Sequence, residues 1–335
     1  MLSRRNLLKA GAAVLLAAAG GASLWQVWRK RGGQSVAALP PLDLAGPKPN
    51  LAFFLLSDIH MTPDSPMVDR LHMALKDVAR FTSHVDTIVL GGDQVDGGRA
   101  GDYRLLQEIL SGYKLPKLYG LMGNHEYYDI WYNAAGEWST ETGPNGKTDA
   151  QARERFLSFM GYKDRPYSDA WVGGVHLLML SQEAYVQERP EIGEGAWYSD
   201  EQLAWLAEKL QPHADGRPAF VFIHQPLPPA GEDGGSHRLI RAKAFRSILQ
   251  PYRNVFVFSG HTHRNLEAEG HYVRDTTFHW FTNASVGKTR STGTLTAPVQ
   301  GLYIQVYSDR VVVRGREFSD GTWIKAADWT VALEP

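Results

Sequence analysis

Short apolar runs recur beyond residue 50, and several of them stop abruptly at residues that can bind metal ions. Their continuous apolar character is typical of strands that are buried on both faces of a sheet. Five runs are followed by candidate ligands, and they span residues 51–56, 87–90, 117–122, 219–223 and 255–258. Because sites in open α/β sheets form at the carboxyl ends of the strands, we expect these five ends to converge on one crevice.

Amphipathic stretches with helical spacing lie between the apolar runs. Asp64–Pro66 has the composition of a helix cap and first turn, and apolar residues then recur at helical intervals up to Phe81. A capping box at Ser199–Gln202 predicts a second helix, and the apolar residues within 239–249 predict a third. After residue 263 the pattern is that of strands, which we expect to complete or widen the sheet, at 278–282, 302–306 and 311–313.

The first 30 residues have the pattern of a targeting segment. Ser3–Lys9, with the sequence SRRNLLK, closely resembles the twin-arginine export signal and precedes an uncharged apolar stretch that ends near Trp28. That stretch has small-residue cleavage sites, but it is also long enough to span a bilayer. We therefore predict that residues 1–30 are a signal peptide or a retained membrane anchor, with cleavage favoured. Residues 31–49 would be a linker and residues 50–335 the folded domain.

Composition narrows the classes of function. Hydrophobic residues make up 43% of the 335 residues and charged residues 21%, which is ordinary for a globular protein. The net charge of −1 hides a basic N-terminus, because the chain after residue 31 has 29 basic and 36 acidic residues, or −7. This balance argues against a nucleic-acid-binding surface. The chain has no cysteine, which excludes disulfides, thiolate nucleophiles and zinc–thiolate sites.

The candidate ligands at the strand ends are carboxylates, imidazoles and one amide. This donor set suits divalent Mn, Fe, Zn, Ni or Co. One aspartate can bridge two such ions, and two ions about 3.5–4 Å apart can hold a hydroxide and neutralise a phosphoryl group. Glycines at 92, 123 and 260 would let the backbone approach the ions closely. The seven candidates are Asp58, His60, Asp93, Asn124, His224, His261 and His263.

These residues form five blocks, D-x-H, G-D, G-N-H-E, H and G-H-x-H, in this order over about 205 residues. The combination resembles the calcineurin-like metallophosphoesterase superfamily, which includes purple acid phosphatases and class III cyclic-nucleotide phosphodiesterases. The resemblance implies an α/β fold that is a four-layer α/β/β/α sandwich. Gln94, Val95 and Asp96 stand where purple acid phosphatases have a tyrosinate ligand, so we do not expect a purple iron–tyrosinate enzyme.

The resemblance also assigns a role to each block. Asp93 would bridge two metal ions, and His125 would lie near the leaving-group oxygen as a general acid or phosphate clamp. The first ion would be held by Asp58, His60, Asp93 and His263, and the second by Asp93, Asn124, His224 and His261.

The function that follows is hydrolysis of a phosphate monoester or diester by a metal-bound hydroxide. Twin-arginine export, with the translocase as a partner, would place the enzyme in the periplasm or elsewhere outside the cytoplasm. The substrate would be a small phosphate ester, or a lipid or cell-wall phosphate. A cyclic-nucleotide phosphodiesterase is the alternative within enzymes. A less favoured alternative is a non-catalytic metal-binding scaffold.

Several residues near the blocks have more modest expected roles. Asp96 and Glu126 are expected to hydrogen-bond to the site rather than to coordinate metal. The aromatic-rich segment 127–138 either walls a pocket or packs its loop onto the body, and 227–237 is a second candidate lip. Lys288 and Arg290 either reach a phosphate or, as we favour, are solvated surface charges. We treat six histidines outside the blocks as surface or packing residues, and these are His72, His84, His176, His213, His271 and His279.

Overall fold

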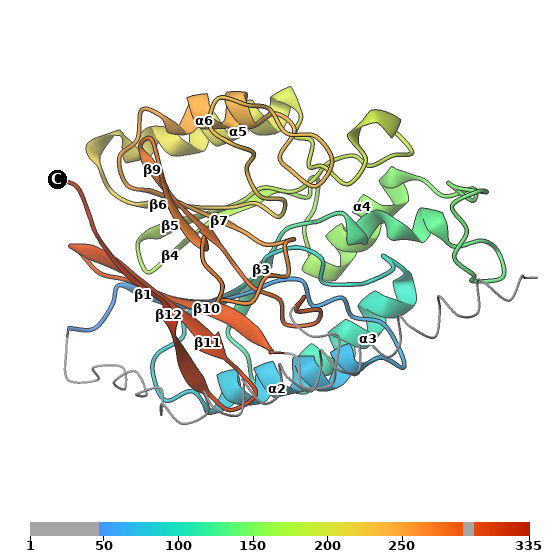
Figure 1. The fold of residues 1–335 in the computed structure, drawn as a ribbon, viewed down its shortest axis with the longest axis horizontal. Coiled ribbons are helices and arrows are strands. Elements are labelled where there is room, and N and C mark those ends of the chain that lie inside the picture. The colour runs from blue at the N-terminus through green and yellow to red at the C-terminus, as the bar shows by residue number, and fades with distance from the viewer. Residues whose placement is uncertain (1–46, 291–297) are drawn as a thin grey trace, which may run out of the picture. The chain divides into compact units, whose positions relative to one another are not determined.

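The computed structural model describes residues 47–290 and 298–335, which form two six-stranded sheets with helices packed on them (Figure 1). The strand order is β12-β11-β10-β1-β2-β3 in the first sheet and β4-β5-β6-β7-β9-β8 in the second. The predicted signal peptide or anchor and most of the predicted linker lie outside the described residues. No helix in the described part of the chain has the length and apolar character needed to cross a membrane.

The five strands that precede candidate ligands are divided between the two sheets. The first sheet contains β1 (Leu51–Leu56), β2 (Thr87–Leu90), β3 (Lys117–Gly120), β10 (Gln300–Val306), β11 (Arg310–Glu317) and β12 (Thr322–Ala332). The second contains β4 (Ser168–Val172), β5 (Val175–Met179), β6 (Ala219–Phe222), β7 (Val255–Ser259), β8 (Tyr272–Asp275) and β9 (Phe278–Thr282). The strands β1, β2 and β3 run parallel, as do β5, β6, β7 and β9. The expectation that the C-terminal strands widen one sheet is wrong, because they extend both.

The helices cover the outer faces of the sheets. On the first sheet lie α2 (Pro66–Arg80), α3 (Ala100–Ser111) and α4 (Asp149–Met160), and on the second α5 (Asp200–Leu210) and α6 (Ala242–Leu249). Short 3-10 helices are η1 (His125–Trp131), η2 (Pro190–Ile192) and η3 (Gln211–Asp215). Ser199 caps α5, since its hydroxyl accepts from Gln202 N at 3.0 Å, but the predicted capping box is incomplete, because Ser199 N donates to Glu183. The third predicted helix begins only at Ala242, because the N–H groups of Leu239 and Ile240 bond to carbonyls of other loops.

Strand β1 shows why the apolar runs have no polar face. Ala52, Phe54 and Leu56 pack in the cluster that includes α2, α3 and α4, whereas Leu51, Phe53 and Leu55 pack in the cluster between the two sheets. Phe53 makes edge-to-face contacts with two rings of β6, with ring centroids 6.0 and 5.8 Å apart. A third cluster joins the second sheet to α5 and α6. The layers are therefore helix, sheet, sheet and helix.

Loops from the two sheets are joined where the parallel strands end. Asp58 N, after β1, donates to Gly92 O, after β2, at 3.0 Å. In the second sheet, Gly260 N donates to His224 O at 2.9 Å. The segment after β9 connects the sheets, since Gly287 N donates to Asp58 O at 3.0 Å. These backbone bonds place strand ends from both sheets around one site.

Candidate metal centre

Six of the predicted ligands fall into two groups of side chains that share Asp93. One potential ligand atom from each member of a group lies within 4.8 Å of those of the others. In one group His263 Nε2 lies 3.1 Å from Asp58 Oδ1 and 3.0 Å from His60 Nε2, and in the other His224 Nε2 lies 3.0 Å from Asp93 Oδ2. The side chains are thus grouped as expected, and their coordination of two ions stays a prediction. The groups are Asp58, His60, Asp93 and His263, and Asp93, His224 and His261.

The backbone at five of these residues has a conformation that residues other than glycine rarely adopt. Positive φ angles occur at Asp58 (54°), His60 (52°), Asp93 (50°), His261 (66°) and His263 (54°). Non-glycine residues with such angles are uncommon, and they persist only where the surrounding structure enforces them. Hydrogen bonds between neighbouring loops do so here, for example His60 N to Asp93 O at 2.9 Å. Strain of this kind is concentrated at functional sites.

The glycines at 92, 123 and 260 leave room for the ligand side chains. A Cβ on Gly123 would lie 2.3 Å from Asp93 Oδ1, and one on Gly260 would lie 2.6 Å from Asp58 Oδ2. At Gly92 a Cβ would lie 2.5 Å from His224 Nδ1, and the φ of +90° there also favours glycine. The observed arrangement of the ligands therefore requires glycine, which has no side chain, at these three positions.

Hydrogen bonds fix which nitrogen of the histidines faces the site. His224 Nδ1 lies 2.8 Å from Gly91 O, and because a carbonyl can only accept, Nδ1 carries the proton. Its Nε2 is then the atom that faces Asp93. His60 Nδ1 lies 3.0 Å from Asp96 Oδ1, which leaves its Nε2 for the site in the same way. Such outer hydrogen bonds orient metal-ligating histidines.

The side chains balance one another's charge without a metal ion. Burial raises the pKa of Asp93, but the neighbouring His224 and His125 hold it well below its usual range. Burial lowers the pKa of His224, but Asp93 outweighs this effect and raises it to about 10. Burial, followed by repulsion from His125, lowers the pKa of His60 to about 3. A metal ion that replaced the proton on His224 Nε2 would offset the negative charge of the buried carboxylates in the same way.

The sequence profile of the calcineurin-like phosphoesterases matches residues 51–265, which include all seven predicted ligands and His125. The chain belongs to the calcineurin-like phosphoesterase family. The glycerophosphodiester phosphodiesterase GpdQ of Enterobacter lignolyticus (strain SCF1) is 22% identical over 186 residues, which cover 53% of this chain and 56% of that protein. The chain thus spans a little over half the length of this curated relative.

Solved structures confirm the fold of this calcineurin-like phosphoesterase. A dimetal phosphatase from Danio rerio superimposes with a TM-score of 0.62 at 17% identity, covering 86% of this chain and 100% of the other. A purple acid phosphatase from yellow lupin seeds gives a TM-score of 0.53 at 12% identity, covering 86% of this chain and 55% of the other. These likenesses confirm the predicted α/β/β/α fold.

The site residues fit the divalent metal ions that the calcineurin-like family uses. Asp93 Oδ2, His224 Nε2 and His261 Nδ1 are buried and make no well-aligned hydrogen bond within residues 47–290 and 298–335, although the first two atoms lie 3.0 Å apart as an ion pair. Buried polar atoms are normally satisfied, so three such atoms at one site indicate a missing partner. Nitrogen and oxygen donors without thiolate suit Mn, Fe, Zn, Ni or Co, and these atoms supply that chemistry.

Asn124, the seventh predicted ligand, is held by residues that the sequence did not single out. Its Nδ2 donates to Glu194 Oε2 at 2.7 Å and to the Tyr128 hydroxyl at 3.0 Å. Its Oδ1 accepts from Gln225 Nε2 at 3.4 Å. Glu194 lies in a loop beyond η2, between two glycines, and follows no apolar run. The pattern of apolar runs that end at polar residues therefore could not identify Glu194.

Asp96 and Glu126 make the expected hydrogen bonds. Asp96 also forms, with His60 and His125, a third group whose ligand atoms lie within 4.8 Å of one another, so its exclusion from metal coordination stays a prediction. Asp96 bonds to His60, and its backbone carbonyl accepts from His125 Nδ1 at 2.8 Å. Glu126 is fully buried and accepts from the backbone N–H groups of Gly123, Gln94 and Asp93, at 2.6, 2.8 and 3.0 Å. The expectation for Lys288 is wrong. Its amine forms an ion pair with Asp96 beside the site, and its side chain is only 35% exposed.

The aromatic segment after the third block packs onto the body at one residue and lies beside His125 at another, and a pocket walled by this segment stays a prediction. Tyr127 is buried and stacks on Tyr185, with ring centroids 5.8 Å apart, so it packs the segment onto the body. The ring of Tyr128 lies 3.9 Å from that of His125 and so borders the site. In the second candidate lip, His237 Nδ1 lies 3.3 Å from His261 Nε2.

The histidines outside the blocks lie in neither ligand group. Four of them are buried and hydrogen-bonded, at His176, His213, His271 and His279. His72 bonds to a tyrosine hydroxyl, and the side chain of His84 is about half exposed. Their expected assignment as packing or surface residues agrees with these positions.

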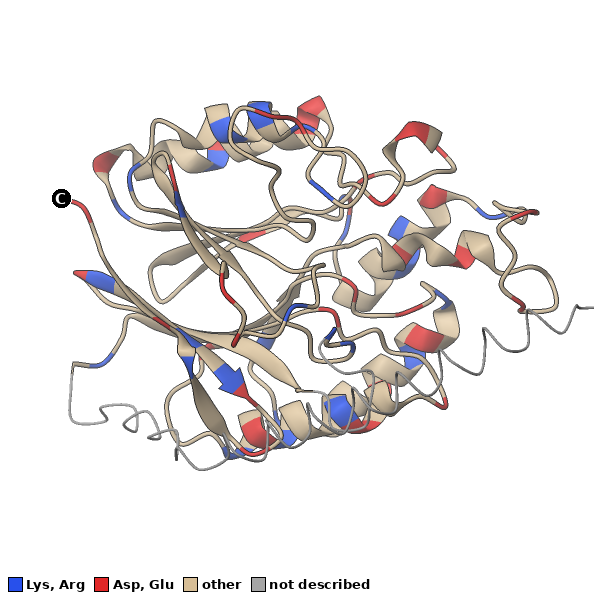
Figure 2. Cartoon of the chain, viewed as in Figure 1, with Lys and Arg blue, Asp and Glu red and all other residues tan. Residues whose placement is uncertain are grey.

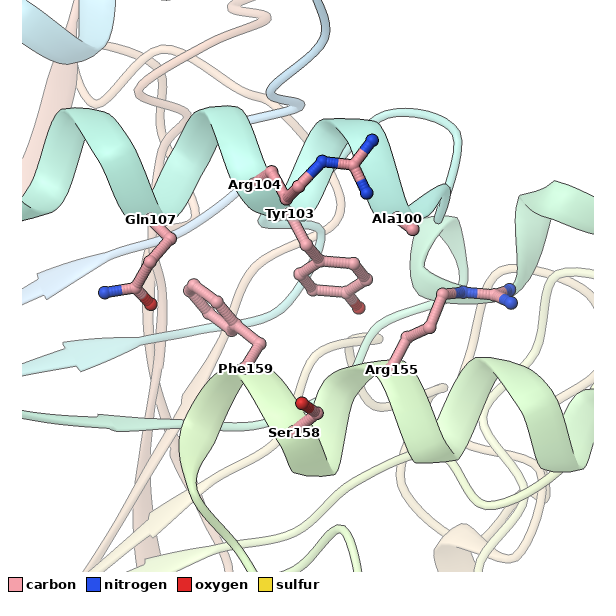
Figure 3. A pocket seen from close by; sticks show the side chains of 7 residues that line it. All are labelled: Ala100, Tyr103, Arg104, Gln107, Arg155, Ser158 and Phe159. Carbon is pink, nitrogen blue, oxygen red and sulfur yellow. The ribbon is translucent and has the colours of Figure 1, made fainter.

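A cavity of about 310 Å³ between α3 and α4 shares no residue with the ligand groups. Figure 3 shows its lining of Ala100, Tyr103, Arg104, Gln107, Arg155, Ser158 and Phe159. Arg155 Nε donates to Gly98 O at 2.8 Å, which ties α4 to the loop that follows Asp96. Basic and acidic residues are interspersed along α2 and α3 (Figure 2).

Proposed function

We propose that this chain is a dinuclear metal-dependent hydrolase of a phosphate monoester or diester. The observation that carries the proposal is the sharing of Asp93 by two groups of buried nitrogen and oxygen donors. Membership of the calcineurin-like phosphoesterase family supports the same reaction class. A small phosphate ester, a lipid phosphate or a cell-wall phosphate would each meet the chemical requirement.

Each side chain has a separate task in this proposal. Asp58, His60 and His263 would hold one ion and Asn124, His224 and His261 the other, with Asp93 between them. Two divalent ions at these positions would activate water and neutralise the oxygens of the phosphoryl group. Asp58 is kept in place by its neighbours, since Ser57 Oγ donates to its Oδ2 at 2.6 Å and His261 N donates to its Oδ1 at 2.9 Å.

His125 would protonate or clamp the leaving oxygen. Its Nδ1 donates to Asp96 O, so Nε2 is the nitrogen that can meet a substrate. Burial lowers the pKa of His125, but attraction to Asp93 and bonding to Asp96 outweigh this effect and raise it. A raised pKa favours the protonated imidazole, the form in which Nε2 can act as a general acid.

Hydrolysis of chromogenic phosphate esters tests the proposal. The purified domain, loaded in turn with Mn²⁺, Fe²⁺, Zn²⁺, Ni²⁺ or Co²⁺, is expected to bind about two ions per chain and to hydrolyse a p-nitrophenyl monoester or diester. Asp93→Asn, His125→Ala and His261→Ala combined are expected to abolish turnover. Fewer than one ion per chain with no turnover on either ester would contradict the proposal, whereas ion binding without turnover would favour the non-catalytic scaffold.

We also propose that residues 1–30 direct twin-arginine export, with residues 31–49 as a linker and residues 50–335 as the exported domain. The support is the segment SRRNLLK at residues 3–9 and the uncharged apolar stretch after it. Arg4→Lys combined with Arg5→Lys is expected to retain the protein in the cytoplasm. Equal amounts of the wild-type protein and of this double variant outside the cytoplasm, measured by cell fractionation, would contradict this route.

A further inference from the structure

Glu194 accepts hydrogen bonds from three side chains beside the candidate metal centre. Asn124 Nδ2 lies 2.7 Å from its Oε2, and the Tyr128 hydroxyl donates to the same oxygen at 2.6 Å. The Tyr185 hydroxyl donates to its other oxygen. Glu194 belongs to neither ligand group, so it contacts the site through Asn124.

The chemistry of Glu194 determines which way the Asn124 amide points. An ionised carboxylate can only accept hydrogen bonds, so the amide must turn its NH₂ toward Glu194. The Tyr128 hydroxyl agrees with this orientation. Its single proton goes to Glu194, and its lone pair accepts the second N–H of Asn124 at 3.0 Å. Both amide protons are thereby used, and the amide oxygen faces away from Glu194.

The loop that carries Glu194 is itself held on both sides. Gly193 has a φ of +52°, and a Cβ on Gly195 would lie 2.5 Å from Gly235 O in the second candidate lip. The carbonyl oxygen of Glu194 accepts from Gln225 Nε2 at 3.1 Å, and Gln225 directly follows His224. The backbone of Glu194 is thus tied to the segment of another predicted ligand.

We propose that Glu194 is a positioning residue for the second metal ion, because it fixes the Asn124 amide with Oδ1 available as the ligand. The inference rests on the proposed function, which assigns Asn124 to that ion. Loss of a group that orients a metal ligand typically lowers metal affinity about 10–100-fold. The effect should be confined to the ion that Asn124 binds.

Equilibrium dialysis against Mn²⁺ measures this effect without relying on activity. Glu194→Gln, which keeps the side-chain shape, is expected to lower the affinity for one of the two ions about 10–100-fold and to leave the affinity for the other unchanged. Glu183→Gln is the matched control, since Glu183 also accepts three hydrogen bonds, from Ser199 and Gln202, but contacts no predicted ligand. Unchanged binding in Glu194→Gln, or an equal loss in the control, would overturn the inference.

A mutant cycle shows whether Glu194 acts through Asn124. In an Asn124→Ala background, Glu194→Gln is expected to have no further effect on Mn²⁺ affinity. In an Asn124→Asp background its effect should change sign, because Glu194→Gln then removes a repulsion between two carboxylates and supplies a donor. The inference would be overturned if Glu194→Gln lowered the Mn²⁺ affinity as much in the Asn124→Ala background as in the wild type. It would also be overturned if Glu194→Gln lowered that affinity in the Asn124→Asp background.

Tyr185→Phe keeps the inference testable if Glu194→Gln does not fold. It removes one donor to Glu194 and touches no predicted ligand, so a smaller loss at the same ion is expected. An unchanged affinity would count against Glu194. A wild-type protein that binds two ions but hydrolyses no ester would contradict the proposed function and leave the role of Glu194 intact.

Discussion

Gly123→Ala adds one methyl group at the closest approach of backbone to the shared ligand. The new Cβ would lie 2.3 Å from Asp93 Oδ1 and 2.5 Å from His224 Cδ2. Ordinary contacts of a Cβ begin at 3.4 Å. The Asp93 carboxylate or the loop must therefore move by about 1 Å, since the core leaves no slack for the methyl group.

The expected cost follows from that displacement. A misplacement of about 1 Å in a catalytic arrangement costs about 100-fold in rate, which corresponds to about 2.7 kcal/mol of transition-state stabilisation. Because Asp93 belongs to both ligand groups, the affinity for both ions should fall as well. The change should also lower the free energy of unfolding by about 1–3 kcal/mol through overpacking.

The assay is kcat/KM for a chromogenic phosphate ester, together with the metal content after dialysis. Gly101→Ala is the matched control, because a Cβ there, in the first turn of α3, meets no atom closer than 3.8 Å. The control should keep wild-type activity and metal content. If Gly123→Ala were as active and as rich in metal as Gly101→Ala, the steric reasoning would be refuted.

Three further changes test other parts of the site and the core. Asp96→Asn should lower kcat/KM about 10–100-fold in steady-state assays, because His60 loses the carboxylate that orients it; an unchanged value would remove Asp96 from the mechanism. Glu126→Gln should lower the free energy of unfolding, measured by urea denaturation, by about 1–3 kcal/mol, since an amide nitrogen would replace an acceptor of buried backbone N–H groups. A variant as stable as the wild type would argue against this role of Glu126. Burial and then Arg274 lower the pKa of His279 from 6.5 to about 4, so its contribution to stability is complete above pH 6.5 and lost as the pH falls toward 4. His279→Gln should show a shallower loss of stability over that window, and equal slopes would contradict the assignment.

The sequence was most informative where a buried strand runs into a polar residue. The strands at β1 and β2 match the predicted runs residue for residue, because a strand buried on both faces must be continuously apolar. The strand-end rule then brings Asp58 and Asp93 together. The division into two sheets came from the family resemblance, since an apolar run does not reveal which neighbour a strand pairs with.

Other elements lacked so strong a pattern. Strand β4 is partly exposed along its length, and β12 mixes buried with exposed residues, so neither forms an apolar run. Residues that support the ligands were harder still to predict. Lys288 and Glu194 lie outside the five blocks, and their contacts with Asp96 and Asn124 depend on how distant loops are brought together. No spacing along the chain encodes those contacts.

The central claim is that two ions are bound on either side of the Asp93 carboxylate. Anomalous diffraction from crystals grown with Mn²⁺ tests it most directly, because it locates the metal independently of activity. Two peaks roughly 3.5–4 Å apart are expected, one among Asp58, His60 and His263 and the other among Asn124, His224 and His261. A single peak, or peaks away from Asp93, would contradict it.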